Sequence, residues 1–326
     1  MRKGIILTVF LCLSLGVALL AYLRLDTAAN RATLYLEQEI SRSKAKDILI
    51  QENEQAEKIQ AVFWGKNTRT NIDAEVFVIC GDARLLIQGM ETLNEEDNEG
   101  CLISTALATE LFKSTNVKGN HINLEETYIV RGVFQSTDKQ LIRLSKDDKD
   151  VFTQVHVHKK ENEIAGSTLY KFTMRHGLMG TTLQWIEYIG IVKGMLLLAV
   201  GLLAMLPCCL IRKILPQNMK LSTKIECLKE VKISPKIVIV GYIGIVLFLL
   251  GKQIQMPIEM IPAKWSDFGY WNMWFRDVGR NVGYVFLLEK TGYEKGFLID
   301  GIWSIIGSMS VIFGSLGILF GYVKRK

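Results

Sequence analysis

The sequence predicts a membrane protein with four transmembrane α-helices, arranged as one plus three, and an α+β extracytoplasmic domain between the first helix and the second. Three observations predict this fold. The 326-residue chain contains several long uncharged stretches, of which residues 301–323 are the longest. It is 49% hydrophobic with a mean hydropathy of only +0.21, which suits a few spans joined to one soluble domain. Its basic residues gather at the two ends and in one loop.

The first span is predicted at residues 1–24, where Arg2 and Lys3 precede 20 uncharged residues at 4–23. The alternative is a secretory signal peptide, whose apolar core is usually about 7–15 residues. The run here is longer, and no small-residue cleavage site follows it. We therefore interpret it as an uncleaved anchor with a cytoplasmic N-terminus.

Residues 25–60 are charged and contain neither Pro nor Gly. Leu34, Ile40 and Ile48 recur with a loose helical period, which predicts a helix that continues the first span as a stalk. The alternative is a solvated linker helix without a mechanical role.

Residues 61–180 are predicted to form the extracytoplasmic α+β core domain. Runs rich in β-branched and aromatic residues predict strands, and Ser104 is a plausible N-cap for a short helix that ends at Phe112. The strands are expected at residues 61–65, 74–80, 122–124, 128–134, 140–144 and 151–157.

Three further spans are predicted at residues 181–211, 237–251 and 301–323. A helix rises 1.5 Å per residue, so the 23 residues of the last run reach about 34 Å, enough to cross a bilayer core of about 30 Å. Small residues spaced four apart in this run let two helix backbones approach closely in lipid. The alternative is that Gly is simply commoner in membrane helices. The candidate packing residues are Ser310, Gly314, Gly317 and Gly321.

Charge predicts the topology, because cytoplasmic loops carry an excess of Lys and Arg. Residues 212–236 contain seven Lys/Arg against two Glu, whereas residues 252–300 carry six charges of each sign. Both termini are then cytoplasmic, and residues 25–180 and 252–300 lie outside. The outer segment 25–180 holds 19 Lys/Arg and 24 Asp/Glu, so the charge of +6 is no nucleic-acid signal.

Residues 252–300 are predicted to form an external aromatic loop. Such side chains settle at the membrane–water interface, although a gate or a substrate-contacting ledge is the alternative. The aromatic residues are Trp265, Phe268, Tyr270, Trp271, Trp274, Phe275, Tyr284 and Phe286.

Two of the six cysteines, Cys80 and Cys101, fall in the external domain. In an oxidising compartment they predict a disulfide, worth about 3 kcal/mol in the chain-entropy model. Two buried free thiols are the alternative, because the sequence does not show whether the two Cα atoms approach closely enough.

The sequence offers no catalytic, cofactor-binding or metal-binding constellation. His156 and His158 share one face of a strand, but no third ligand follows nearby, so an exposed strand end is the better interpretation. A nucleophile elbow, an HExxH motif and a phosphate-binding P-loop are all missing from the sequence. We therefore expect no enzyme and no nucleotide site in this chain.

Local sequence patterns add a resemblance to a known family. The one-plus-three order of spans resembles the permease subunits of MacB-like and FtsX-like ABC systems, and so do short motifs in the external domain, where Lys113 stands at a position that usually holds Gly. Residues 261–268 (IPAKWSDF) also look like such proteins. The similar motifs are AVFWG at 61–65, GCLIS at 100–104, ATELF at 108–112, VKG at 117–119 and YIVRGV at 128–133.

The resemblance implies a non-catalytic permease in a bacterial cytoplasmic membrane, which pairs with another permease as a homo- or heterodimer. A separate cytoplasmic ABC ATPase would move the spans, and the stalk would carry that motion outward to export or extract a hydrophobic or peptide-like substrate. The loop 212–236 would couple to the ATPase. Its candidate contact residues are Arg212, Lys213, Ile214, Leu215, Lys220, Lys224, Ile225 and Leu228.

Two other functions remain open at this stage. An FtsX-like regulator of a cell-wall hydrolase would share the same architecture. A membrane-anchored sensor or binding module would have no ATPase partner.

Overall fold

The computed structural model describes residues 2–67, 73–87, 93, 97–124, 126–158, 163–214, 219–220, 232–233, 240–244, 246, 251 and 266–323. These residues divide into two compact units. One holds residues 26–187 and 279–299, and the other holds residues 1–25, 188–278 and 300–326. We call them the sheet unit and the helix unit and describe each by itself.

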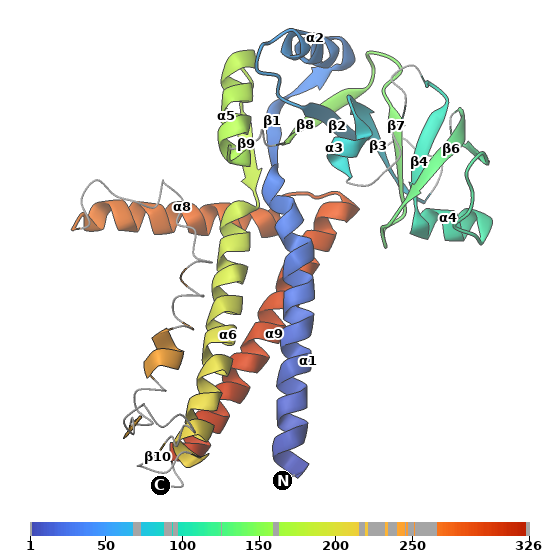
Figure 1. Ribbon diagram of the computed structural model, residues 1–326. Helices are drawn as coiled ribbons and strands as arrows, with labels where there is room; N and C mark the ends of the chain where they lie inside the picture. The colour runs from blue at the N-terminus through green and yellow to red at the C-terminus, as the bar shows by residue number, and fades with distance from the viewer. Residues whose placement is uncertain are drawn as a thin grey trace, which may run out of the picture. The chain divides into compact units, whose positions relative to one another are not determined.

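The sheet unit is built on a nine-stranded mixed sheet with the order β5-β6-β4-β7-β3-β2-β8-β1-β9 (Figure 1). Neighbours β3 and β7, and β4 and β6, run parallel, and the other neighbours run antiparallel. The strands are β1 (Arg31–Ser41), β2 (Ala61–Asn67), β3 (Glu75–Cys80), β4 (Gly100–Ser104), β5 (His121–Asn123), β6 (Thr127–Phe134), β7 (Gln140–Leu144), β8 (Val151–His158) and β9 (Gly180–Gln184).

Four helices accompany this sheet. They are α2 (Arg42–Asn53), α3 (Ala83–Leu86), α4 (Thr105–Phe112) and α5 (Ala165–His176). The Ser104 hydroxyl accepts from the Leu107 N–H at 3.2 Å, which caps α4 as the sequence predicts.

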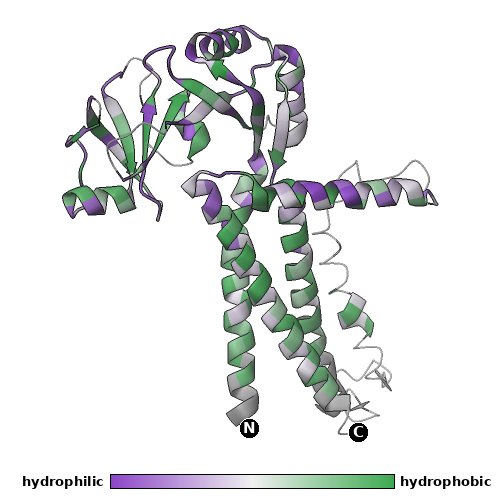
Figure 2. Cartoon of the chain, turned by 180° about the vertical axis from the view of Figure 1, so that it is seen from behind, coloured by the Kyte–Doolittle hydropathy of each residue, from purple (hydrophilic) through white to green (hydrophobic). Residues whose placement is uncertain are grey.

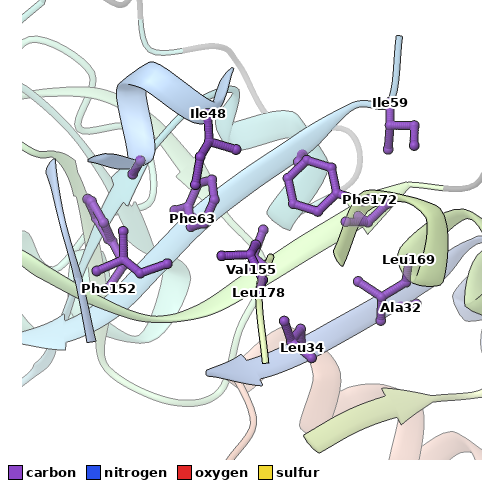
Figure 3. Packing of buried hydrophobic residues seen from close by; sticks show 14 of the residues in the cluster. Ala32, Leu34, Ile48, Ile59, Phe63, Phe152, Val155, Leu169, Phe172 and Leu178 are labelled. Carbon is purple, nitrogen blue, oxygen red and sulfur yellow. The ribbon is translucent and has the colours of Figure 1, made fainter. Parts of the chain in front are cut away.

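One face of the sheet carries an apolar core under α2 and α5 (Figure 3). Phe63 and Phe172 place their ring centroids 6.4 Å apart in this core. Two further apolar clusters include Trp64 and Phe134 in one case and Cys101 and Leu107 in the other. These three clusters together form the apolar interior of the sheet unit.

The α+β prediction for this part of the chain is confirmed, and strands occur near each predicted position. The continuous stalk helix predicted over 25–60 is wrong. A 3₁₀ turn at Thr27–Asn30 leads into β1, and only α2 is helical after it. Residues 31–35 alternate between the two sheet faces, so Leu34 fits a strand period as well as the helical one.

The helix unit contains apolar helices that appear largely green in Figure 2. Among the described residues, three segments are long and apolar enough to cross a membrane: Val9–Asn30, Ile186–Pro207 and Gly292–Phe320. The first lies in α1 (Arg2–Asp26) and the 3₁₀ turn after it, and the other two lie in α6 (Ile186–Ile214) and α9 (Gly292–Val323). Most of the predicted span 237–251 lies outside the described residues.

Two segments of the chain differ from their predictions. The start predicted for the second span, residues 181–184, belongs to β9, and α6 begins only at Ile186. The predicted aromatic loop contains a 20-residue helix, α8 (Phe268–Leu287), and α9 begins at Gly292 rather than at residue 301. The first two turns of α9 belong to the sheet unit, while its remainder belongs to the helix unit.

Candidate functional site

The face of β1 opposite the apolar core carries polar side chains. Ala32 and Leu34 point into that core. The residues that alternate with them along the strand point to the other face, and they are Arg31, Thr33 and Tyr35. Arg31 is 1% exposed and Thr33 is fully buried. Buried polar groups need hydrogen-bond partners, so another segment of the chain must cover Arg31 and Thr33 and bond to them.

The start of α9 provides those partners. Thr291 and Glu294 form a capping box: the Thr291 N–H donates to Glu294 Oε2 at 3.0 Å, and the Glu294 N–H donates to Thr291 Oγ1 at 3.2 Å. The Thr33 hydroxyl lies 3.4 Å from Glu294 Oε1. Glu294 is only 2% exposed, so the helix start is part of the interior of the sheet unit.

His156 on β8 extends this buried network. Its Nδ1 lies 2.8 Å from Thr33 Oγ1, and its ring is fully enclosed. Burial lowers the pKa of His156 well below its usual value, and the positive charge of Arg31 adds to the effect. The ring is therefore neutral in the folded protein, and the exposed strand end expected from sequence is wrong for His156.

Arg31 is held by both a carbonyl and two rings. Its Nη1 donates to the Leu86 carbonyl at 2.9 Å, and its guanidinium lies 4.9 Å from the Tyr293 ring centroid and 5.6 Å from that of Phe297. Burial lowers the pKa of Arg31, and the negative charge of Glu294 and the Tyr293 side chain act in the opposite direction. A desolvated guanidinium over two neighbouring aromatic rings is a strong cation–π arrangement.

Further contacts surround this network. The Tyr35 hydroxyl donates to the Glu289 carbonyl, and Lys295 pairs with Asp138 at 2.6 Å. A Cβ on Gly292 would lie 2.6 Å from Ser136 Oγ, so the backbone of α9 approaches the β6–β7 connection closely. We call residues 289–297 together with Arg31, Thr33 and His156 the helix anchor.

The helix anchor is suited to mechanical attachment. Pulling α9 away would separate Glu294 from Thr33 and would remove the Tyr293 and Phe297 rings from Arg31. Leaving a buried polar group without its partner costs about 1–3 kcal/mol. The sequence signal that could have found this site is the T-x-x-E pattern at residues 291–294, which precedes an apolar run.

A cleft of about 550 Å³ lies elsewhere on the sheet unit, between the ends of β2, β3, β6 and β7. Three of its basic residues form ion pairs: Lys66 with Glu75, Arg143 with Asp150, and Lys146 with Glu126. Lys149 lines the cleft as well, and this mixture of charges does not identify a ligand.

The predicted disulfide is wrong. Cys80 is on β3 and Cys101 is on β4, and β7 lies between these strands. Two strand spacings amount to about 9–10 Å, beyond the Cα separation of about 7 Å that a disulfide spans. Burial raises the pKa of the Cys101 thiol to about 12, which keeps it protonated.

The predicted coupling residues fall at the edge of the described structure. Arg212, Lys213 and Ile214 form the end of α6, and Lys220 lies in the two-residue strand β10 (Met219–Lys220), which pairs with β11 (Lys232–Ile233). The remaining predicted contact residues lie outside the described residues: Leu215, Lys224, Ile225 and Leu228.

The predicted packing face of the last helix is correct only in part. A Cβ on Gly314 would meet the Leu11 side chain, but nothing described lies within 4 Å of one on Gly317. Ser310 bonds back to the Ile306 carbonyl in its own helix. The surroundings of Gly321 lie outside the described part.

Ser304 and Gly307 contact α1 as well. The Ser304 hydroxyl donates to the Ala18 carbonyl at 2.9 Å. A Cβ on Gly307 would lie 2.8 Å from the Ser14 carbonyl oxygen. Gly307 lies seven residues, about two turns, before Gly314, so the contact with α1 follows the Gly314 side of α9 and leaves out Gly317.

Comparisons with known proteins give several partial structural matches, and two of them are described here. The periplasmic region of MacB from Actinobacillus actinomycetemcomitans aligns over 48% of this chain and 90% of that chain, with 12% identity and a TM-score of 0.36. The extracellular domain of the noncanonic ABC-type transporter YknZ from Gram-positive bacteria aligns over 47% of this chain and 98% of that chain, with 13% identity and a TM-score of 0.34. No family model and no curated protein matches the sequence.

Proposed function

We propose that this chain is the non-catalytic membrane subunit of an ABC-type system, in which a separate cytoplasmic ATPase moves the spans and α9 carries that motion to an outward-facing sheet domain. The exported or extracted substrate would be hydrophobic or peptide-like. The observation that carries the proposal is the helix anchor. The long apolar helix α9 begins as part of the sheet core, with Glu294 buried in it.

The helix α9 is continuous from Gly292 to Val323, which suits transmission of motion better than a flexible linker would. Force on a helix is transmitted only if both ends are fixed to something rigid. Ser304 and Gly307 contact α1 within the helix unit, and the capping box fixes the other end within the sheet unit. A sensor or a cell-wall regulator would share this geometry, so the partner distinguishes the alternatives.

The test begins with gentle solubilisation of the full chain from its native membrane. An ATP-hydrolysing partner should co-purify with it, and the reconstituted pair should change the fluorescence of an Asn120→Cys label on the sheet domain when nucleotide is trapped. Recovery of the chain with no ATPase would overturn the proposal and favour the sensor.

A variant of the helix anchor separates the transmission of motion to the sheet domain from the binding of the ATPase. Glu294→Ala removes the capping carboxylate, and we expect ATPase binding and hydrolysis to persist while the Asn120 signal is lost. Glu110→Ala, which removes only an exposed partner of Lys139, is the matched control and should keep the signal. An intact signal in Glu294→Ala would show that the helix anchor transmits nothing.

A further inference from the structure

The helix α8 carries a line of exposed phenylalanine side chains along one face. Phe268, Phe275 and Phe286 are 7 and 11 residues apart, close to two and three helical turns, so they lie in one line along the helix. Their exposed fractions are 82%, 63% and 52%. Trp271 and Trp274 adjoin this line and stack with Phe275, at centroid distances of 6.5 and 5.0 Å.

Charged residues occupy the neighbouring side of α8. Arg276 and Arg280 are four residues apart and lie about a quarter to a third of a turn from the Phe line. A helix with aromatic residues on one face and arginines beside it typically lies at the boundary between lipid headgroups and acyl chains. The arginine stems can then reach the phosphates while the rings enter the acyl region.

A contact of α8 with α6 lies where the apolar segment of α6 begins, which is where the lipid headgroups would be. Asn281 Nδ2 donates to Glu187 Oε1 at 3.0 Å, and Glu187 is in the first turn of α6, where an apolar segment long enough to cross a membrane begins. Val285, one turn after Asn281, is fully buried. The first half of α8, which shares the helix unit with α6, runs across the direction of α6 (Figure 1, Figure 2).

We propose that α8 is an in-plane membrane-surface helix, whose line of Phe268, Phe275 and Phe286 enters the lipid leaflet at the Glu187 end of α6. Lipid fits the exposed aromatic line better than a second protein does. The reason is that α8 contacts Glu187, at the end of the apolar segment of α6 that is long enough to cross a membrane. This inference rests on the chain crossing a membrane and is independent of any ATPase partner.

Depth-dependent quenching tests this placement. The full chain is reconstituted in nanodiscs whose lipids carry bromine either near the headgroup or near the end of the acyl chain. The contribution of α8 is the emission difference between the unsubstituted chain and the Trp271→Phe/Trp274→Phe variant. We expect shallow bromine to cause a large loss of this emission and deep bromine a smaller loss.

Two outcomes would overturn the inference. Absence of quenching by either lipid would mean that α8 is in water or covered by protein, including a second copy of the chain. Equal or stronger quenching by deep bromine would mean that α8 enters the acyl region rather than lying at its edge.

A matched pair of variants keeps the test specific. Phe275→Glu places a charge in the proposed lipid contact and should reduce the quenching of Trp271 and Trp274. Met273→Glu places the same charge on an exposed residue about 140–160° around the helix from the Phe line and should leave the quenching unchanged. Equal effects of the two substitutions would also contradict the in-plane placement.

Discussion

Lys113 has a left-handed backbone, with φ of 55°, directly after α4. Its N–H donates to the Thr109 carbonyl at 3.0 Å, so it closes the helix as a C-cap. Left-handed backbone costs a non-glycine residue about 1–2 kcal/mol. The resemblance at this position implies Gly, and the structure shows the backbone that Gly would favour.

We therefore expect Lys113→Gly to stabilise α4 by about 0.5–1 kcal/mol, because relief of backbone strain exceeds the entropy that Gly adds to the unfolded chain. Hydrogen exchange of the α4 amides in the full chain measures this change. Lys149→Gly, at a turn residue without positive φ, is the control and should destabilise its turn slightly. Faster exchange of α4 in Lys113→Gly would refute the strain argument.

His156 gives the sheet unit a pH dependence with a definite sign. Its folded-state pKa is lowered, so its contribution to stability is complete above the unfolded value of about 6.5 and is lost as pH falls below it. The slope is at most about 1.4 kcal/mol per pH unit for one proton.

His156→Gln should remove that slope while keeping a hydrogen-bonding group beside Thr33. Unfolding of the full chain in nanodiscs between pH 5 and 7 measures it, with His121→Gln on the exposed strand β5 as the control. The same slope in His156→Gln and in the unsubstituted chain would show that His156 is not the titrating group.

At the scale of elements, the contact between α1 and α9 depends on Gly307. A larger side chain there would meet Ser14 and Ala18, whereas one at Gly317 meets no described atom within 4 Å. We expect Gly307→Leu to destabilise the helix pair by about 1–3 kcal/mol through overpacking. Gly317→Leu should change little.

The measurement is the temperature at which each variant loses monodispersity in detergent. A loss in Gly317→Leu as large as that in Gly307→Leu would mean that α9 packs on the face first predicted from its sequence, and that the contact with Ser14 is not decisive.

Much of the sheet could be predicted from sequence, because strands such as β6 and β8 combine β-branched residues with clear boundaries. The segment 31–41 could not, because polar residues at its start face the interior. The sequence gives no local sign that Arg31 and Thr33 are buried, since their burial depends on the start of α9.

The helix anchor illustrates the same limit. Glu294 and His156 are 138 residues apart in sequence, and each is polar, so neither indicates a core position locally. Their burial is a property of long-range pairing. In contrast, the spacing of Phe268, Phe275 and Phe286 is a local property of the sequence, so the helix α8 could be predicted from its helical period alone.

At the scale of the whole molecule, the charge pattern predicts which segments face outward. In intact cells, a Cys at Asn120 should react with a membrane-impermeant maleimide, and a Cys at Lys220 should react only after lysis. The unsubstituted chain, which has six cysteines, gives the background. Reaction of Lys220→Cys alone before lysis would invert the topology and remove the basis for a cytoplasmic ATPase.

The proposed function requires the start of α9 to move with the sheet. Because Gly292 approaches Ser136 closely, the double variant Ser136→Cys/Gly292→Cys should form a disulfide that locks the helix anchor. The reconstituted ATPase complex provides the assay, through the nucleotide response of a label at Asn120. We predict that the oxidised, locked protein gives the same response as the reduced protein. A response that disappears on oxidation and returns on reduction would show that the anchor must open, and would contradict the account.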